Sequence, residues 1–109
     1  MEPLIYFNPE KFDLELVVEV DLAEPDYSFD LLCIWRHTKT GKLYMATDSG
    51  CSCPIPFEFV KFEDLTPVDN ARQVEFIMEE TGNGVQPYVP LGRRKTVVQD
   101  IKKLLKEAK

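Results

Sequence analysis

Apolar and polar residues alternate along the segment from Phe12 to Leu22. Every second position is apolar, and the positions between them are acidic except for Val17. A period of two over this length predicts a half-buried strand of an antiparallel sheet, with one face against the core. The expected apolar face consists of Phe12, Leu14, Leu16, Val18, Val20 and Leu22.

The next segment, Phe29–Arg36, contains the nearly continuous apolar run LLCIW. Such a run is typical of a central strand that is covered on both faces. Residues 37–42 predict a turn in which Gly41 is free to take a positive φ, and Leu43–Thr47 predicts a returning strand. Strands adjacent in sequence usually pair, so the three segments predict a meander.

A helix is favoured after Thr66. Thr66 fits an N-cap, Pro67 the first helical position and Asp69 an early acidic position, and Gly82 follows as a stop. The expected buried stripe is Ala71, Val74, Ile77 and Met78. A hairpin across residues 69–89 is the alternative, since Val74, Phe76 and Met78 also alternate before the turn sequence TGNG.

The pattern from Lys95 to Ala108 predicts a C-terminal helix. One helical stripe collects its apolar residues, Val97, Val98, Ile101, Leu104, Leu105 and Ala108. The fold class predicted for the whole chain is therefore α+β. A small antiparallel sheet of three to five strands is packed on one face by the C-terminal helix and, if residues 66–81 are helical, by a second helix. With 109 residues, we expect a single domain over 1–109.

Charge is distributed unevenly along the chain. Residues 1–80 hold 17 Asp and Glu against 6 Lys and Arg, whereas residues 81–109 hold 2 against 7. The basic end is expected to lie across the acidic body or to be solvated; a surface that selects a charged partner is the alternative. Seven positive charges on an acidic protein make a poor nucleic-acid footprint. No apolar run is long enough for a membrane span, and the N-terminus lacks the pattern of a secretory signal, so a cytoplasmic location is expected.

The segment after the third strand is unusual in composition. Asp48 and Ser49 can cap backbone amides, Gly50 permits positive φ, and two prolines favour an extended path. The sequence therefore predicts a stiff loop over 48–56, with the cis or trans state of its X–Pro bonds left open. The candidate binding surface consists of Asp48, Ser49, Gly50, Cys51, Ser52, Cys53, Pro54, Ile55 and Phe57.

The residues of this region also carry a resemblance. Trp35, Gly41 and Tyr44, the string DSGCSCP at residues 48–54 and the following PFE resemble a family of small uncharacterised proteins of actinobacterial phages. The resemblance covers roughly residues 32–66. It implies a phage-encoded product in the host cytoplasm, and it implies no activity and no functional residue.

The cysteines raise two further hypotheses. Cys33, His37, Cys51 and Cys53 form a three-Cys, one-His set that suits tetrahedral zinc. Cys33 and His37 would lie about 13 Å apart on a straight strand, and Cys-x-Cys is not the usual zinc spacing. A thiol nucleophile at Cys51 or Cys53 beside His37, with Asp48 as orienter, is a weaker reading. Packing thiols, with no cofactor, are favoured.

The function expected from the sequence is a non-enzymatic phage accessory protein that binds a host or phage protein through the 48–57 loop and its aromatic neighbours. A zinc-stabilised domain or small metalloenzyme is one alternative. Another is acidic mimicry of nucleic acid by the strand face that carries Asp13, Glu15, Glu19 and Asp21.

Overall fold

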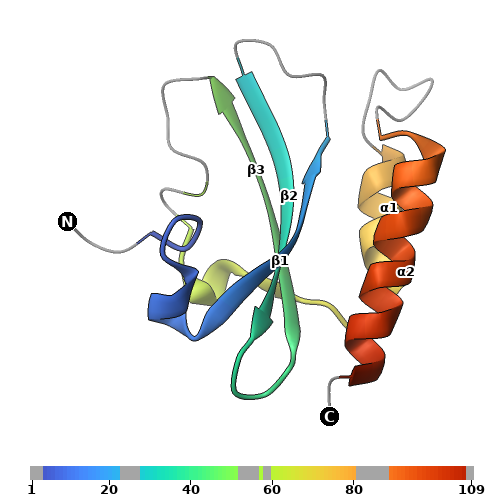
Figure 1. Cartoon of the computed structure of the whole chain (residues 1–109). Helices are drawn as coiled ribbons and strands as arrows, with labels where there is room; N and C mark the ends of the chain where they lie inside the picture. The colour runs from blue at the N-terminus through green and yellow to red at the C-terminus, as the bar shows by residue number, and fades with distance from the viewer. Residues whose placement is uncertain (1–3, 23–27, 52–56, 58–59, 81–88, 108–109) are drawn as a thin grey trace.

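The computed structural model describes residues 4–22, 28–51, 57, 60–80 and 89–107. These residues form an antiparallel four-stranded sheet, in the order β1-β2-β3-β4, and two α-helices (Figure 1). The predicted fold class is confirmed, with both helices present. The elements in chain order are η1 (Pro9–Phe12), β1 (Leu14–Asp21), β2 (Ser28–His37), β3 (Leu43–Cys51), η2 (Phe62–Asp64), β4 (Thr66–Pro67), α1 (Ala71–Glu80) and α2 (Leu91–Glu107).

Strand β2 is the centre of the sheet, as its apolar run predicts. It pairs with β1 on one side and, from Ser28 to Arg36, with β3 on the other. Residues 31–35 are all buried. Because successive side chains point to opposite faces, Leu32 and Ile34 belong to one core cluster, and Cys33 and Trp35 belong to the other.

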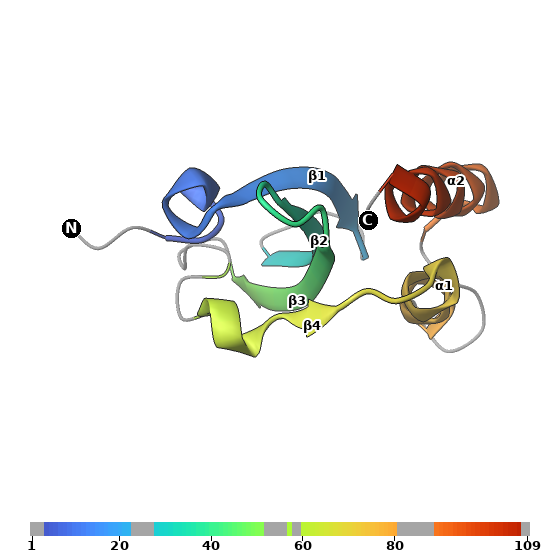
Figure 2. The same ribbon diagram turned by 90° about the horizontal axis from the view of Figure 1, so that it is seen from below.

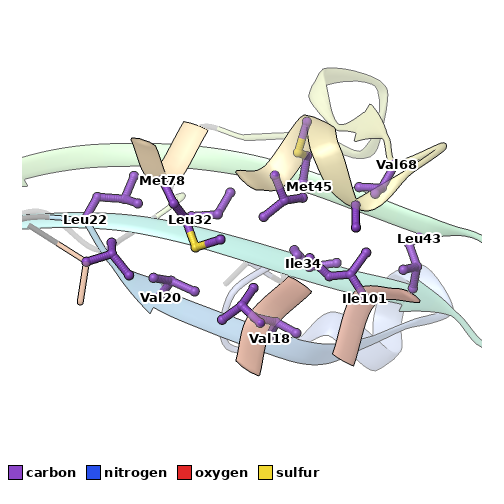
Figure 3. Packing of buried hydrophobic residues seen from close by; sticks show 14 residues of the cluster. Val18, Val20, Leu22, Leu32, Ile34, Leu43, Met45, Val68, Met78 and Ile101 are labelled. Atoms are coloured by element: carbon purple, nitrogen blue, oxygen red, sulfur yellow. The ribbon is translucent and has the colours of Figure 1, made fainter. Parts of the chain in front are cut away.

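The two helices cover one face of the sheet. They lie side by side on the same side of the strands (Figure 2) and pack against each other. Ala71, Val74 and Met78 of α1 and Val97 and Ile101 of α2 meet the sheet residues in the first cluster. Figure 3 shows how Met78 and Ile101 point toward the strand side chains. The strands and the residues that directly follow β1 and β4 contribute to the same cluster: Val18, Val20, Leu22, Leu32, Ile34, Leu43, Met45 and Val68.

The opposite face of the sheet has a core of its own, as the apolar run of β2 predicts, but the segments that cover this face were not predicted. Two irregular segments cover it through η1 and η2, namely residues 4–13 and, among the described residues, Phe57 and 60–65 (Figure 2). The buried members of this second cluster are Ile5, Leu14, Leu31, Cys33, Trp35, Phe57 and Leu65. The sheet is therefore enclosed between a helical layer and a thin, irregular layer.

A β-bulge in β1 corrects the prediction of one continuous apolar face. Leu16 pairs with Trp35 and Val18 pairs with Ile34, so Val17 has no partner on β2. An extra residue in a strand shifts the alternation by one position. As a result Leu14 and Leu16 pack in the second cluster, whereas Val18, Val20 and Leu22 pack under the helices.

Helix α1 begins at Ala71, four residues later than predicted. Thr66 and Pro67 form β4, which pairs with Met45 and Tyr44 of β3, so Thr66 is not an N-cap. Asn70 caps the helix instead. Its Oδ1 accepts a hydrogen bond from Gln73 N at 3.2 Å, and Gln73 Oε1 accepts one from Asn70 N at 3.0 Å. This reciprocal pair is a capping box.

The remaining boundaries differ from the predictions in a few places. Strand β3 runs to Cys51, so residues 48–51 are paired strand and not loop. Helix α2 begins at Leu91, four residues before the predicted start. Gly41 has a φ of 79°, as the predicted turn requires. The predicted helix stop at Gly82 lies outside the described residues. Within the part of the chain that the structure describes, no helix is long and apolar enough to cross a membrane.

Candidate functional site

The structure divides the predicted 48–57 binding surface into three parts. Asp48, Ser49, Gly50 and Cys51 are the last residues of β3, where they pair with Leu31, Asp30, Phe29 and Ser28. The middle of the predicted surface lies outside the described residues; it comprises Ser52, Cys53, Pro54 and Ile55. The prediction about the cis or trans state of the X–Pro bonds falls in the same segment. Phe57 is fully buried.

Asp48 and Phe57 hold the two described ends of this segment together. The Phe57 N–H donates a hydrogen bond of 2.7 Å to Asp48 Oδ2. Phe57 has a φ of 61°, which a bulky residue adopts only when its surroundings require it. Its ring packs edge-on against Trp35 at a centroid distance of 5.4 Å. Phe57 is thus a core anchor, as expected for an aromatic residue of this segment, and it is not an exposed member of the candidate binding surface.

A series of aromatic rings leads from this anchor to the surface. Tyr6 stacks on Phe57 at 5.8 Å, and Phe7 packs edge-on against Tyr6 at 5.1 Å. Trp35 and Phe57 are 0% exposed, whereas Phe7 is 58% exposed. Rings of the N-terminal segment therefore continue the buried aromatic core outward to solvent.

A second group of rings lies over the β2–β3 hairpin. Phe62 of η2 packs against Tyr44 at 5.1 Å and against His37 at 6.2 Å, and it is 36% exposed. Tyr44 pairs with Trp35 in the sheet register. Because η1 and η2 both lie on the side of the sheet away from the helices (Figures 1 and 2), the two groups share one side of the molecule. We call this side the aromatic face; its rings are Tyr6, Phe7, Trp35, Tyr44, Phe57 and Phe62.

A hydrogen-bonded cluster fastens the N-terminal segment to the sheet beside these rings. Tyr6 Oη donates to Glu19 Oε1 at 2.6 Å, and Cys33 Sγ lies 3.9 Å from the same oxygen. The hydrogen bond to Glu19, together with burial, raises the pKa of Tyr6. Burial, followed by the charge of Glu19, raises the pKa of the Cys33 thiol. Cys33 therefore stays protonated at neutral pH and is a poor nucleophile.

The described residues do not bring the predicted zinc ligands together. His37 closes β2 at the hairpin end, and its Nδ1 accepts hydrogen bonds from the N–H groups of Lys39 and Thr40. Cys51 pairs with Ser28 at the other end of β2, about 30 Å away at roughly 3.3 Å per residue. Within the described residues there is no group of three or more potential metal ligands. The Cys51–His37 nucleophile pair is separated by the same distance, and Cys53 lies outside the described part.

The acidic strand face expected for nucleic-acid mimicry is also divided. Glu15 forms an ion pair of 2.7 Å with Arg36, whereas Glu19 bonds to Tyr6 on the aromatic side. Asp13 precedes the strand and lies 3.5 Å from Lys39. The bulge at Val17 separates Glu15 from Glu19, so the four acids do not form one continuous surface.

A groove beside α2 was not predicted from the sequence. It consists of two adjoining hollows of about 420 and 210 Å³. Both hollows are lined by Glu15, Arg36, Leu104 and Glu107. We call them together the α2 groove. Because the pairing of Glu15 with Arg36 depends on the bulged register, hydrophobic periodicity alone offers no signal for this site.

Comparison with known proteins identifies one family. The family model described as a domain of unknown function (DUF7574) matches residues 4–109. No curated protein matches the chain, and no solved structure matches it. The matched region includes the sheet, both helices and the irregular layer that carries the aromatic face.

Proposed function

The chain belongs to the DUF7574 family, and we propose that it is a non-enzymatic domain that binds another protein through the aromatic face. The observation that carries this proposal is the path of contacting rings from buried Trp35 through Phe57 and Tyr6 to exposed Phe7. Aromatic residues are enriched at the centres of protein interfaces, where large rings bury much area.

The aromatic face is held in place before any partner binds. Phe57 is locked by burial and by its hydrogen bond to Asp48, and Tyr6 is tied to Glu19. Rigid anchors lose little conformational entropy on association, so more of their contact energy is available for affinity. Exposed charged residues surround the rings, as in the polar rim of an interface. They include Glu10, Lys11, Lys61, Glu63 and Asp64.

Phe57 belongs both to the candidate binding surface predicted from the sequence and to the aromatic face. The two surfaces are therefore connected at this residue. The resemblance of the motif to actinobacteriophage proteins supports a phage accessory role. The proposed partner is then a host or phage protein in the bacterial cytoplasm. A protein partner fits a candidate site that offers aromatic contacts. Among its described residues, this site contains no complete catalytic set.

Affinity capture with matched variants tests the proposal. A tagged chain is used to capture proteins from nuclease-treated actinobacterial lysate, beside Phe7→Ser, Phe62→Ser and the control Phe76→Ser. Phe76 is 54% exposed but lies on α1, away from the aromatic face. We expect one stoichiometric partner with the wild-type chain and Phe76→Ser, and its loss with Phe7→Ser and Phe62→Ser. Equal capture by all four chains, or no specific capture, would refute the proposal.

A further inference from the structure

The N-terminal segment, residues 4–13, is held on the sheet by few buried contacts. We call this segment the strap. Ile5 is its one buried side chain, and η1, which lies within it, contains no buried residue. Tyr6 and Phe12 are partly buried against the second core cluster, whereas Phe7 is exposed. Segments with few buried apolar contacts open at a lower free energy than the rest of a fold.

The strap is not a strand of the sheet. Main-chain hydrogen bonds close turns inside it, as where the Asn8 N–H donates to Leu4 O at 2.7 Å. The link to the hairpin lies at its last residue, because Asp13 O accepts a hydrogen bond of 2.8 Å from the Thr38 N–H. Asp13 has a φ of 58°, so the chain changes direction there before β1 begins. The strap can therefore leave the sheet without breaking a strand pair.

Tyr6 fastens the strap directly above a buried thiol. Tyr6 Oη donates to Glu19 Oε1 at 2.6 Å, and Cys33 Sγ lies 3.9 Å from the same oxygen. Glu19 is exposed, whereas Cys33 is 0% exposed. Movement of Tyr6 away from Glu19 would therefore uncover Cys33, which makes this thiol a reporter of the position of the strap.

The closed layer also contains two unfavourable features. The buried Trp35 Nε1 has no hydrogen-bond partner among the described residues, and a buried donor without an acceptor costs free energy. Phe57 has a left-handed backbone, which only its packing maintains, and Tyr6 of the strap supplies one side of that packing. Both features lie in the second cluster, so opening of the layer relieves part of their cost.

We infer that the strap opens as a unit about Asp13 while the sheet and the helical layer stay folded, and that its open state exposes Cys33. The helical layer does not share this property, because both of its helices are anchored by buried side chains. One consequence rests on the proposed function. Phe7 belongs to the strap and Phe62 to η2, so a partner that contacts both rings holds the strap closed.

Alkylation of Cys33 by iodoacetamide, in water and at increasing urea concentrations, tests this inference. The full chain carries Cys51→Ser and Cys53→Ser, which leaves Cys33 as its single thiol. We expect labelling in water to be faster than global unfolding allows. The labelling rate should stay nearly constant at low urea, because opening of the strap exposes little surface. A rate no faster than global unfolding allows, with the urea dependence of global unfolding, would overturn the inference.

Two further variants of this chain separate the strap from the rest of the fold. Tyr6→Phe removes the hydrogen bond to Glu19, so labelling at low urea should become about tenfold faster, the scale of one hydrogen bond to a charged group. Asn70→Ala removes the cap of α1 and lowers global stability, but it should leave this rate unchanged. Equal acceleration in both variants, or none in Tyr6→Phe, would contradict a local opening. Because no partner is added, the result is independent of the capture experiment.

Discussion

Phe57 shows how a single residue can connect two parts of the fold. It has a left-handed backbone conformation, yet its ring is fully buried between Trp35 and Tyr6, and its N–H is bonded to Asp48. The favourable burial of a large ring offsets the unfavourable backbone conformation. Phe57 thereby fixes the point at which the chain returns from β3 to the aromatic side of the sheet.

Replacing Phe57 is expected to be costly. Phe57→Ala should lower the free energy of unfolding by about 3–5 kcal/mol, because it leaves a cavity beneath Tyr6. Urea denaturation measures the change, with Phe57→Leu as a milder variant if the alanine variant does not fold. Phe76→Ala, on the exposed surface of α1, should change stability by no more than about 0.5 kcal/mol. A similar cost at both positions would contradict the anchoring role of Phe57.

The raised pKa values of Tyr6 and Cys33 predict a loss of stability at alkaline pH. Both groups are neutral when protonated, and the folded state holds these protons more tightly than the unfolded chain. Their stabilisation is therefore fully present below the ordinary pKa values, 9.0 for Cys and 10.0 for Tyr. It is lost progressively as the pH rises above them. Tyr6→Phe should flatten this decline in urea midpoints measured from pH 8 to 11; an unchanged slope would exclude Tyr6 as a cause.

Among the elements, β1 contains the feature that organises both cores. The bulge at Val17 lets one alternating segment supply Leu14 and Leu16 to the aromatic side and Val18 and Val20 to the helical side. It also separates Glu15 from Glu19 along the strand. One extra residue thus places groups on both sides of the sheet.

Deleting Val17 should preserve both cores. Without this residue, Leu16 and Val18 are consecutive residues of a regular strand opposite Trp35 and Ile34, so each neighbouring side chain keeps its face. We expect a folded protein that loses about 1–2 kcal/mol, similar to the loss in Val17→Ala. Thermal unfolding followed by circular dichroism measures both variants. A deletion variant that does not fold, while Val17→Ala does, would show that Val17 is not the bulged residue.

The start of α1 gives a second prediction at this scale. Asn70→Ala removes the side-chain cap and should cost about 1 kcal/mol. Thr66→Ala changes an exposed residue of β4 and should have an effect within about 0.5 kcal/mol. The free energies of unfolding of the two variants, measured in urea, show which residue caps the helix. A larger cost at Thr66 would favour the helix start expected from the sequence.

Local patterns predicted much of the fold, for reasons visible in particular residues. The run from Leu31 to Trp35 is apolar because both faces of β2 are covered, and the stripe containing Val97 and Ile101 faces the sheet. The signal Asn70-x-x-Gln73 was also present, but Thr66-Pro67 offered a competing cap. The bulge at Val17 was not predictable from alternation, because all the apolar positions around it keep even spacing.

The candidate site was less predictable than the fold. The composition of residues 48–57 predicted a shaped segment, and Phe57 was expected to be a core residue, but its contacts were not predicted. The contacts of Phe57 with Trp35 and Tyr6 join residues far apart in the sequence. Exposed Phe7 and Phe62 carry no motif, and only the second core shows that they lie on one side of the sheet.

At the scale of the whole molecule, the two faces of the sheet are built differently. One is covered by α1 and α2, and the basic outer surface of α2 contrasts with the acidic remainder of the chain. The other is covered by short irregular segments that carry exposed rings. The helical layer stabilises the sheet, and the irregular layer carries the side chains that contact a partner. Functional residues commonly lie on irregular segments that a rigid scaffold holds in place.

Hydrogen–deuterium exchange on the chain, alone and bound to the captured partner, tests this account most directly. Binding at the aromatic face predicts slower exchange in residues 4–7, 44–46 and 60–63, with little change in α1 away from the contact. Protection confined to α1 and the outer surface of α2, with none around Phe7 and Phe62, would contradict it.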